Sequence, residues 1–313
     1  MTKDQPAKTG VAVVGSLHYD IMVRAPYLPR QGETLMGTHW WWKPGGKGGN
    51  QAMAAARHGA AVEMIGALGA DDFAARLRGC LSEAGVGQGH VRDVPQGSGM
   101  SVALVEGGGD YSAVVVSGAN LAIDAGQIKA SAAAIQGARI LLLQNEISPS
   151  ANIAAARLAR ASGTFVILNA APARLPDNDL GSLVQLLVVN AVEAEMLGAG
   201  PVTDLTSAAA AARHLNTPEY TVIVTAGAHG LAGASSREVV TLAAHPVATA
   251  ETHGAGDVFV GALAARLAAD DALAQALAYA NAAAALHVSA GEAGRSRITP
   301  PDVEALLAAS QPG

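Results

Sequence analysis

The stretch RILLLQNEISPSANIAAARLARASGTFVILNA (residues 139–170) contains two short apolar runs separated by an alanine-rich segment. The runs at 139–146 and 164–170 have the length of buried strands, and the segment between them predicts a helix from about Pro149 to Ser162. A strand, a helix and a second strand in this order form a βαβ unit, in which the two strands lie parallel and helices cover the sheet. This stretch therefore predicts an α/β fold.

The same alternation continues on both sides of this unit. Further strands are expected at 11–20, 62–69, 186–190 and 220–227, and further helices at 48–60, 258–268 and 272–289. Two β-rich parts, at 33–42 and at 100–118 around the hairpin signal GGGD, do not fit this rhythm. We therefore expect one domain over 1–313 with a small β-sheet, able to act as a lid, inserted from about 21–44 and 98–119.

The composition narrows the class of protein. The chain has 313 residues, of which 50% are hydrophobic and 15% are charged, so it can bury a large core. A net charge of -6 without basic runs argues against nucleic acid as a partner. The single cysteine, Cys80, excludes a disulfide within the chain, and no apolar segment has the length of a signal sequence or a membrane span. These features predict a cytoplasmic protein.

Polar side chains end or closely follow several of the expected strands. They are Asp20, Glu146, Asn190 and Thr225. In an open parallel sheet the ligand binds beyond the carboxyl ends of the strands. We therefore expect these four residues to line one edge of the sheet.

The segment ETHGAGDVFVGALAARL (251–267) places two glycines and Asp257 before a helix expected to begin at about Val258. A helix N-terminus has unpaired N–H groups and a partial positive charge, and glycines allow the backbone to close around an anion. A phosphoryl group in transfer needs such a binding site, and a carboxylate beside it can accept the proton of a hydroxyl. The alternative is that Asp257 only caps the helix.

A second glycine-rich turn, PGGKGGNQA (44–52), precedes another expected helix. It matches neither the P-loop nor the G-x-G-x-x-G pattern, and Asn50 stands at the expected N-cap. In NAVE (190–193), Asn190 and Glu193 fit a capping box, but they could equally organise a hydrated Mg²⁺. Both segments thus have a structural and a functional interpretation.

Trp40, Trp41 and Trp42 cannot share one face of a strand, because successive side chains alternate. Either they seal a small hydrophobic core, or one face covers a ligand while the other packs against a partner. The histidines lack the spacing of zinc ligands.

Taken together, these motifs resemble the ribokinase family of carbohydrate kinases, the PfkB superfamily. GGKGGNQAMAAARHGA (45–60) resembles its first signature and ETHGAGDVFVGAL (251–263) its second, in the expected order. GSLHYD (15–20), GET (32–34), LNAAPAR (168–174), NAVEAE (190–195) and TAGAHG (225–230) extend the resemblance over almost the whole chain. The resemblance implies a three-layer α/β sandwich with a mostly parallel central sheet and a small β lid.

The resemblance also implies an activity, namely ATP-dependent phosphorylation of a primary hydroxyl, most simply that of D-ribose to give ribose 5-phosphate. Asp257 corresponds to the catalytic base, and Gly254, Ala255 and Gly256 correspond to the anion hole. The positions that match sugar-binding residues are His18, Asp20, Gly46, Lys47, Asn50 and Glu146, together with Asp257. Those that match nucleotide-binding residues are Asn190, Thr225, Ala226, Gly227, Ala228, His229, Gly230, Gly256 and Asn281.

Metal ions and a homodimer formed through the lids belong to the same implication. Asn190 and Glu193 match the motif that arranges Mg²⁺ through water, and K⁺ is expected beside the anion hole. The K⁺ ligands would be Glu251, His253 through its carbonyl, His287, Ala290, Glu292 and Ser296.

Three residues depart from the family pattern. His18 replaces an asparagine that bonds the sugar, Glu251 replaces an aspartate, and Glu292 stands where glycine is usual. The substrate therefore stays open between a pentose, a nucleoside, and a hexose or its phosphate. A non-catalytic sugar sensor is the alternative from another class.

Overall fold

The computed structural model describes residues 8–106 and 111–310. Its centre is a nine-stranded sheet. In spatial order its strands are β13 (Val239–Ala243), β12 (Gly230–Ala234), β11 (Thr221–Thr225), β10 (Leu186–Asn190), β9 (Phe165–Asn169), β8 (Ile140–Gln144), β1 (Val11–Val14), β4 (Val62–Gly69) and β5 (Gly87–Val94). Only β12 pairs antiparallel with its neighbours, so the sheet is mostly parallel, as the sequence predicts.

Two hydrophobic clusters, one on each face of this sheet, form the core. Alternate residues of a strand enter different clusters: Val13 and Leu142 face one, whereas Val14 and Leu143 face the other. The helices on the first face are α1 (Lys47–Arg57), α2 (Asp72–Glu83), α9 (Ala255–Ala268), α10 (Leu273–Ser289) and α12 (Pro300–Ala309). Those on the second are α3 (Ala125–Ala130), α4 (Ala132–Gly137), α5 (Pro149–Ala161) and α8 (Leu205–Leu215). The three-layer α/β architecture is confirmed.

Short helical segments complete the described chain. They are η1 (Gly118–Ala122), α6 (Asn178–Gly181), α7 (Ala191–Met196), η2 (Gly227–His229) and α11 (Glu292–Arg295). None of the helices in residues 8–106 and 111–310 is long and apolar enough to cross a membrane.

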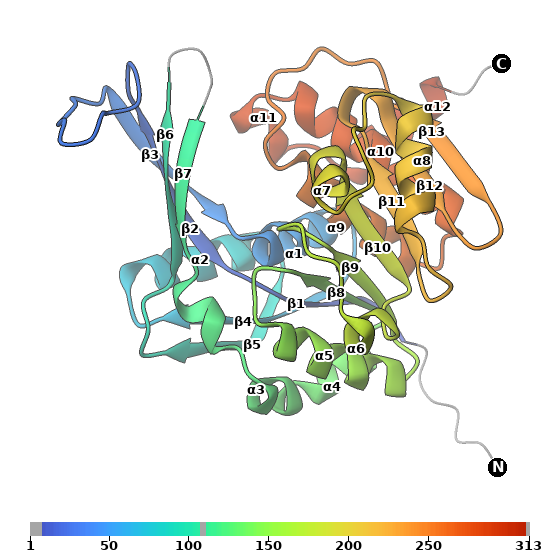
Figure 1. Cartoon of the computed structure of the whole chain (residues 1–313). Coiled ribbons are helices and arrows are strands. Elements are labelled where there is room, and N and C mark those ends of the chain that lie inside the picture. Colours follow the sequence, from blue (N-terminus) through green and yellow to red (C-terminus); the bar gives the residue numbers. More distant parts are fainter. Residues whose placement is uncertain (1–7, 107–110, 311–313) are drawn as a thin grey trace.

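A second sheet of four strands stands away from the rest of the molecule (Figure 1). Its strand order is β3 (His39–Gly45), β2 (His18–Arg24), β6 (Gly99–Val105) and β7 (Tyr111–Val116). The run at 11–20, expected as one strand, is divided between the two sheets, because the chain leaves β1 at Val14 and re-enters a strand at His18. The expected GGGD turn, 107–110, lies outside the described residues.

The three tryptophans occupy different environments in the second sheet. The Trp42 ring stacks on Tyr19 with 4.6 Å between the ring centroids, and Tyr19 stacks on Phe73 of α2 with 4.2 Å between the centroids. These contacts anchor the second sheet to the main body. Trp41, on the opposite face, stacks on His39. Trp40 is 63% exposed. Of the two interpretations of the tryptophans, the sealed core therefore applies to Trp42 alone.

Candidate active site

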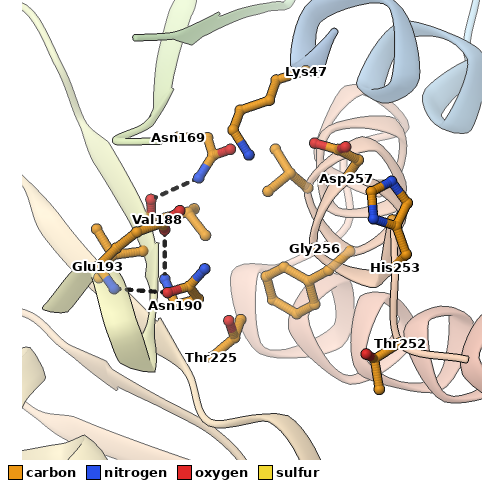
Figure 2. Close-up of a pocket in the computed structure, with 14 residues that line it drawn as sticks. Lys47, Asn169, Val188, Asn190, Glu193, Thr225, Thr252, His253, Gly256 and Asp257 are labelled. Atoms are coloured by element: carbon orange, nitrogen blue, oxygen red, sulfur yellow. Dashed lines mark hydrogen bonds between the residues drawn. The ribbon is translucent and has the colours of Figure 1, made fainter. Parts of the chain in front are cut away.

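A cavity of about 300 Å³ lies between the carboxyl ends of three strands and the N-terminus of α9 (Figure 2). Polar and charged side chains from five segments face it, namely Lys47, Asn169, Asn190, Glu193, Thr225, Thr252, His253 and Asp257. Asn190 and Thr225 are the last residues of β10 and β11 and stand side by side in register. We expected these two residues at one edge of the sheet, and the cavity lies at that edge.

Asp257 lies in the first turn of α9, which begins at Ala255 and not at Val258 as expected. The N-cap is Gly254, whose φ of 81° is a left-handed conformation that glycine adopts without strain. The Ala255 N–H donates to the Thr252 carbonyl at 3.3 Å, whereas the N–H groups of Gly256 and Asp257 have no partner among the described residues. The first turn of α9 therefore offers two N–H groups that can donate hydrogen bonds to an anion.

The Asp257 carboxylate does not cap its helix. One oxygen accepts a hydrogen bond from Asn50 Nδ2 at 3.1 Å and the other from Gln51 Nε2 at 2.9 Å. Asn50 was expected at an N-cap, but α1 begins after Gly46, which places Asn50 inside the first turn. Both donors thus come from α1, and they fix the carboxylate at the wall of the cavity that Lys47 also lines (Figure 2).

Close packing of α1 against α9 allows these two hydrogen bonds. A Cβ at Gly261 of α9 would lie 2.6 Å from the Ala54 Cβ and 2.6 Å from the Gln51 carbonyl oxygen. Because no real side chain fits at such distances, only glycine at 261 lets the helices approach this closely. Gly261 is therefore needed for the position of Asp257.

A chain of buried amides fixes the direction in which Gln51 donates. Asn169 Nδ2 donates to the Val188 carbonyl at 3.1 Å, so Asn169 Oδ1 faces Gln51 and accepts from Gln51 Nε2 at 2.9 Å. Gln51 Oε1 then accepts from Gln144 Nε2 at 2.8 Å. Since a carbonyl can only accept, the Val188 oxygen orients every amide in the chain. Gln51 must therefore present its NH₂ group to Asp257.

Burial raises the pKa of Asp257 above its ordinary value, and the nearby charge of Glu146 adds to this. The positive charge of Lys47 and the hydrogen bonds from Gln51 and Asn50 act in the opposite direction. A carboxylate whose pKa is raised is a stronger base than one in water, while the two amide donors preserve its ionised form. This environment suits a group that accepts a proton.

Glu146 follows β8 and binds the start of α1. Its Oε2 accepts from the Lys47 N–H at 2.8 Å and from the Ser16 hydroxyl. An anion at a helix N-terminus is stabilised by the unpaired N–H groups and the helix dipole. Glu146 thus joins the turn after β1 to the start of α1.

Asp20 and His18 lie on the same face of β2, two residues apart. The Ser101 hydroxyl donates to Asp20 Oδ1 at 2.6 Å. His18 is 4% exposed, and its Nε2 has no hydrogen-bond partner within the part of the chain that the structure describes. Asp20 was expected at the end of a strand of the main sheet. That expectation is wrong, because the residue belongs to the second sheet.

Asn190 and Glu193 form the capping box of α7. Glu193 N–H donates to Asn190 Oδ1 at 2.8 Å, and Asn190 N–H donates to Glu193 Oε2 at 2.9 Å. Both side chains also line the cavity, so the structural and functional interpretations are compatible (Figure 2). Burial raises the pKa of Glu193, which makes its carboxylate a good acceptor. No group of three or more metal-ligating side chains occurs in the described residues.

The other expected nucleotide-binding residues lie beyond Thr225. Residues 226–230 form the turn between β11 and β12, closed by Ala226 N–H donating to the Gly230 carbonyl at 2.7 Å. Asn281 of α10 donates to the Ala243 carbonyl at 2.8 Å, and the neighbouring Ala244 N–H donates to the His229 carbonyl at 3.3 Å. The turn and Asn281 are therefore held together by the end of β13.

Three of the six expected K⁺ ligands, Glu251, His253 and His287, are already engaged by protein groups. The Arg295 guanidinium donates to the Glu251 carbonyl at 2.8 Å, pairs with the Glu251 carboxylate at 3.1 Å and donates to the His287 carbonyl at 3.3 Å. His287 Nε2 donates to the His253 carbonyl at 2.9 Å. This arrangement does not fit the expected K⁺ ion, because the cationic side chain of Arg295 already binds the oxygens of Glu251 and His287.

The three remaining expected K⁺ ligands lie at the C-terminal end of α10 and after it. Ala290 is the C-cap residue of α10, and its N–H donates to the Leu286 carbonyl at 3.1 Å. Ser296 is exposed, and the side chain of Glu292 lies outside the described part of the chain. These positions add no described side-chain contact to the set.

Sequence reasoning missed several residues of the site. Gln51 and Gln144 are fully buried, and Asn169 is 8% exposed. Amides in an apolar strand or helix are a usable signal, because they are buried only when they have partners. Arg295 gave no signal, since its partners are carbonyl groups about forty residues earlier and on a neighbouring helix.

The fold and this cavity define a class of enzyme. The family model of the pfkB carbohydrate kinases matches residues 8–300. The chain belongs to this family and is an ATP-dependent carbohydrate kinase.

The similarity to known carbohydrate kinases extends over most of this chain. A ribokinase of Haemophilus influenzae is 33% identical over 281 residues, which are 89% of this chain and 92% of the relative. A deoxyribokinase of Salmonella typhimurium is 32% identical over 257 residues, covering 81% of this chain and 84% of the relative. The structure of Arabidopsis thaliana ribokinase complexed with ribose and ATP has a TM-score of 0.86 at 29% identity, covering 96% of this chain and 99% of that one.

Proposed function

We propose that this chain transfers the γ-phosphate of ATP to the primary hydroxyl of a pentose, with D-ribose as the substrate and ribose 5-phosphate as the product. The observation that carries the proposal is the Asp257 carboxylate, fixed by Asn50 and Gln51. It lies beside the N–H groups of Gly256 and of Asp257 itself, which have no partner in the described part of the chain. A base for the hydroxyl and donors for the phosphate thus stand at one end of one cavity. The ribokinase with ribose and ATP that this chain resembles supports the choice of sugar.

In this mechanism, Asp257 accepts the proton of the primary hydroxyl as its oxygen attacks the γ-phosphorus and the bond to ADP breaks. The free N–H groups of the first turn of α9 stabilise the charge on the moving phosphoryl group, together with the partial positive charge of the helix end. Lys47, which points into the cavity, offers a further positive charge. No covalent intermediate with the protein is needed, since positioning and charge stabilisation are sufficient.

The sugar would lie between the second sheet and the start of α1. Asp20 and Glu146 supply carboxylate acceptors for its hydroxyls. Gly46 lets the start of α1 lie against the backbone of Leu17 and His18, because a Cβ there would be 2.8 Å from the His18 nitrogen. His18 supports this placement, because its buried Nε2 needs a partner that a sugar hydroxyl can supply. An imidazole offers one ring nitrogen as donor and one as acceptor, so it can replace the amide of an asparagine.

Asn190 and Glu193 would hold Mg²⁺ through water at the nucleotide side of the cavity. This donor set fits the ion, because Mg²⁺ keeps several waters and takes one or two carboxylates together with phosphate oxygens. When bound, Mg²⁺ neutralises charge on the phosphates. The turn 226–230 and Asn281 would contact the nucleotide beyond it.

A panel of acceptors tests this proposal. ADP release, followed by a coupled assay with Mg²⁺, is expected to give the highest kcat/KM with ribose among pentoses, 2-deoxyribose, hexoses, hexose phosphates and nucleosides. Product analysis should find the phosphate on the primary hydroxyl. A nucleoside or hexose phosphate preferred over ribose would contradict the substrate assignment. If none of the acceptors stimulates ADP release, the result would instead favour a non-catalytic sugar sensor.

The second sheet would act as a lid and as the contact of a homodimer. Asp20, Lys43 and Ser101 lie on its inner face, in register across three strands. The outer face carries Val102 and Val114 beside one another, with Val114 70% exposed. Exposed apolar side chains on a sheet face fit a second copy of the same sheet. The single, half-buried Cys80 suits a reducing cytoplasm as the site of action.

We expect Val114→Asp to dissociate the dimer. One valine contributes about 1.5 kcal/mol or more when buried, and a two-fold interface contains it twice, so Kd should rise by about 100-fold or more. Sedimentation velocity over a range of protein concentrations measures this change. Val240→Asp, at an exposed valine of β13, is the matched control. A wild-type chain that sediments as a monomer at all concentrations would contradict the proposed dimer.

A further inference from the structure

Residues 250–253, which precede the first turn of α9, are hydrogen-bonded to the end of α10, and we call this set of contacts the clasp. Main-chain N–H groups of Ala250 and Glu251 donate to the Val288 carbonyl at 2.8 and 3.3 Å. His287 reaches the His253 carbonyl from the same helix end, at 2.9 Å. Gly254, the N-cap of α9, follows directly. The direction in which the first N–H groups of α9 point therefore depends on how 250–253 is held.

Arg295 is the central connection of this clasp. Its guanidinium binds the carbonyl and the carboxylate of Glu251, at 2.8 and 3.1 Å, and the carbonyl of His287, at 3.3 Å. The side chain is only 13% exposed. A planar guanidinium with five donors is suited to join several oxygens that converge from different segments. Arg295 thus joins the segment before α9 to the end of α10.

Charge also disfavours a separate ion at this place. Arg57 and Arg295 both line one small pocket beside His58 and His287. The carboxylate of Glu251 is already paired with Arg295, one of these two cations. A further cation would meet two positive side chains and no unpaired carboxylate in this described pocket.

We propose that the Arg295 guanidinium takes the place of the monovalent cation, so that the kinase works without K⁺. This inference rests on the proposed function, because it concerns the turn that would bind the phosphoryl group. Arg295 is a positioning residue, which acts on the reaction through the segment 250–254.

The test compares three proteins in three salts. Wild type, Arg295→Ala and Arg297→Ala are assayed with saturating sugar in choline, sodium and potassium chloride at equal ionic strength. Arg297 is exposed and two residues away, so its variant removes the same charge and leaves the clasp intact. Thermal unfolding of each protein in each salt is recorded in parallel.

Wild type and Arg297→Ala are expected to differ by less than about twofold between the salts. Arg295→Ala should lose about tenfold or more in kcat in choline, because the turn is no longer held. Potassium, or added guanidinium at low concentration, should restore part of that loss and raise the unfolding temperature of this variant alone.

Potassium that activates the wild type by tenfold or more, or that raises its unfolding temperature, would overturn the proposal. So would an Arg295→Ala protein as active in choline as the wild type. The unfolding arm needs no turnover, so it reports on the clasp even if the proposed reaction fails. Absence of turnover with every acceptor, together with unfolding that responds to K⁺ only in Arg295→Ala, would reject the function and keep the clasp.

Discussion

Asp257→Asn is expected to lower kcat by about two to four orders of magnitude while leaving the affinity for sugar and nucleotide within a few-fold. The amide has the shape of the carboxylate and can still accept from Gln51, so the packing of α1 on α9 should persist. It cannot take the proton of the attacking hydroxyl. The measurements are ADP release at saturation and calorimetric titration of each substrate.

The control for this variant is Asp93→Asn. Asp93 lies on β5, its side chain is 65% exposed, and it forms an ion pair with Arg78 of α2. Its activity should be unchanged. An Asp257→Asn protein with turnover within about threefold of the wild type would reject Asp257 as the base. A protein that no longer binds sugar would instead assign Asp257 to binding.

Gln51→Leu is expected to change both the pH profile and the stability. Gln51 donates to the ionised form of Asp257, so its loss should raise the pKa of that carboxyl further. A base is active when deprotonated, so the acidic limb of kcat should move to higher pH, by about one unit or more for a hydrogen bond to a charged group. Rates across a pH series measure this shift.

Stability should fall because the substitution leaves Gln144 Nε2 and Asn169 Oδ1 without their partner in the buried chain of amides. Each unsatisfied buried group costs about 1–3 kcal/mol, so we expect the two to lower the free energy of unfolding by denaturant by about 2–6 kcal/mol.

Gln127→Leu is the matched control, since Gln127 is also a buried amide and donates to the Gly66 and His90 carbonyls outside the site. It should lose stability without moving the pH profile. A Gln51→Leu protein whose acidic limb coincides with that of the wild type would contradict the role of the amide chain.

The strands of the main sheet could be predicted from sequence because each is a short apolar run whose alternate residues enter the two halves of the core. β8 and β9 illustrate this, since nearly every side chain in them is buried. The division of 11–20 between two sheets was not predictable in the same way. Ser16 and Leu17 are buried like a strand, and only the tertiary contacts show that the chain changes sheet there.

The site was partly predictable for a similar reason. Asp257, Asn190 and Thr225 follow directly from strand ends and a helix start, which are local features of the sequence. Gln51 and Arg295 act through partners that are distant in the chain, and no local pattern indicates such pairs. The departure at the expected cation site therefore became visible only when the end of α10 and residues 250–253 were seen together.

A crystal structure with ribose and a non-hydrolysable ATP analogue would test the central claim most directly. We predict that an Asp257 carboxylate oxygen lies within about 2.6–3.2 Å of the primary hydroxyl, and that the N–H groups at the start of α9 point to the terminal phosphate. A primary hydroxyl bound to another side chain, or a terminal phosphate away from these N–H groups, would contradict the claim.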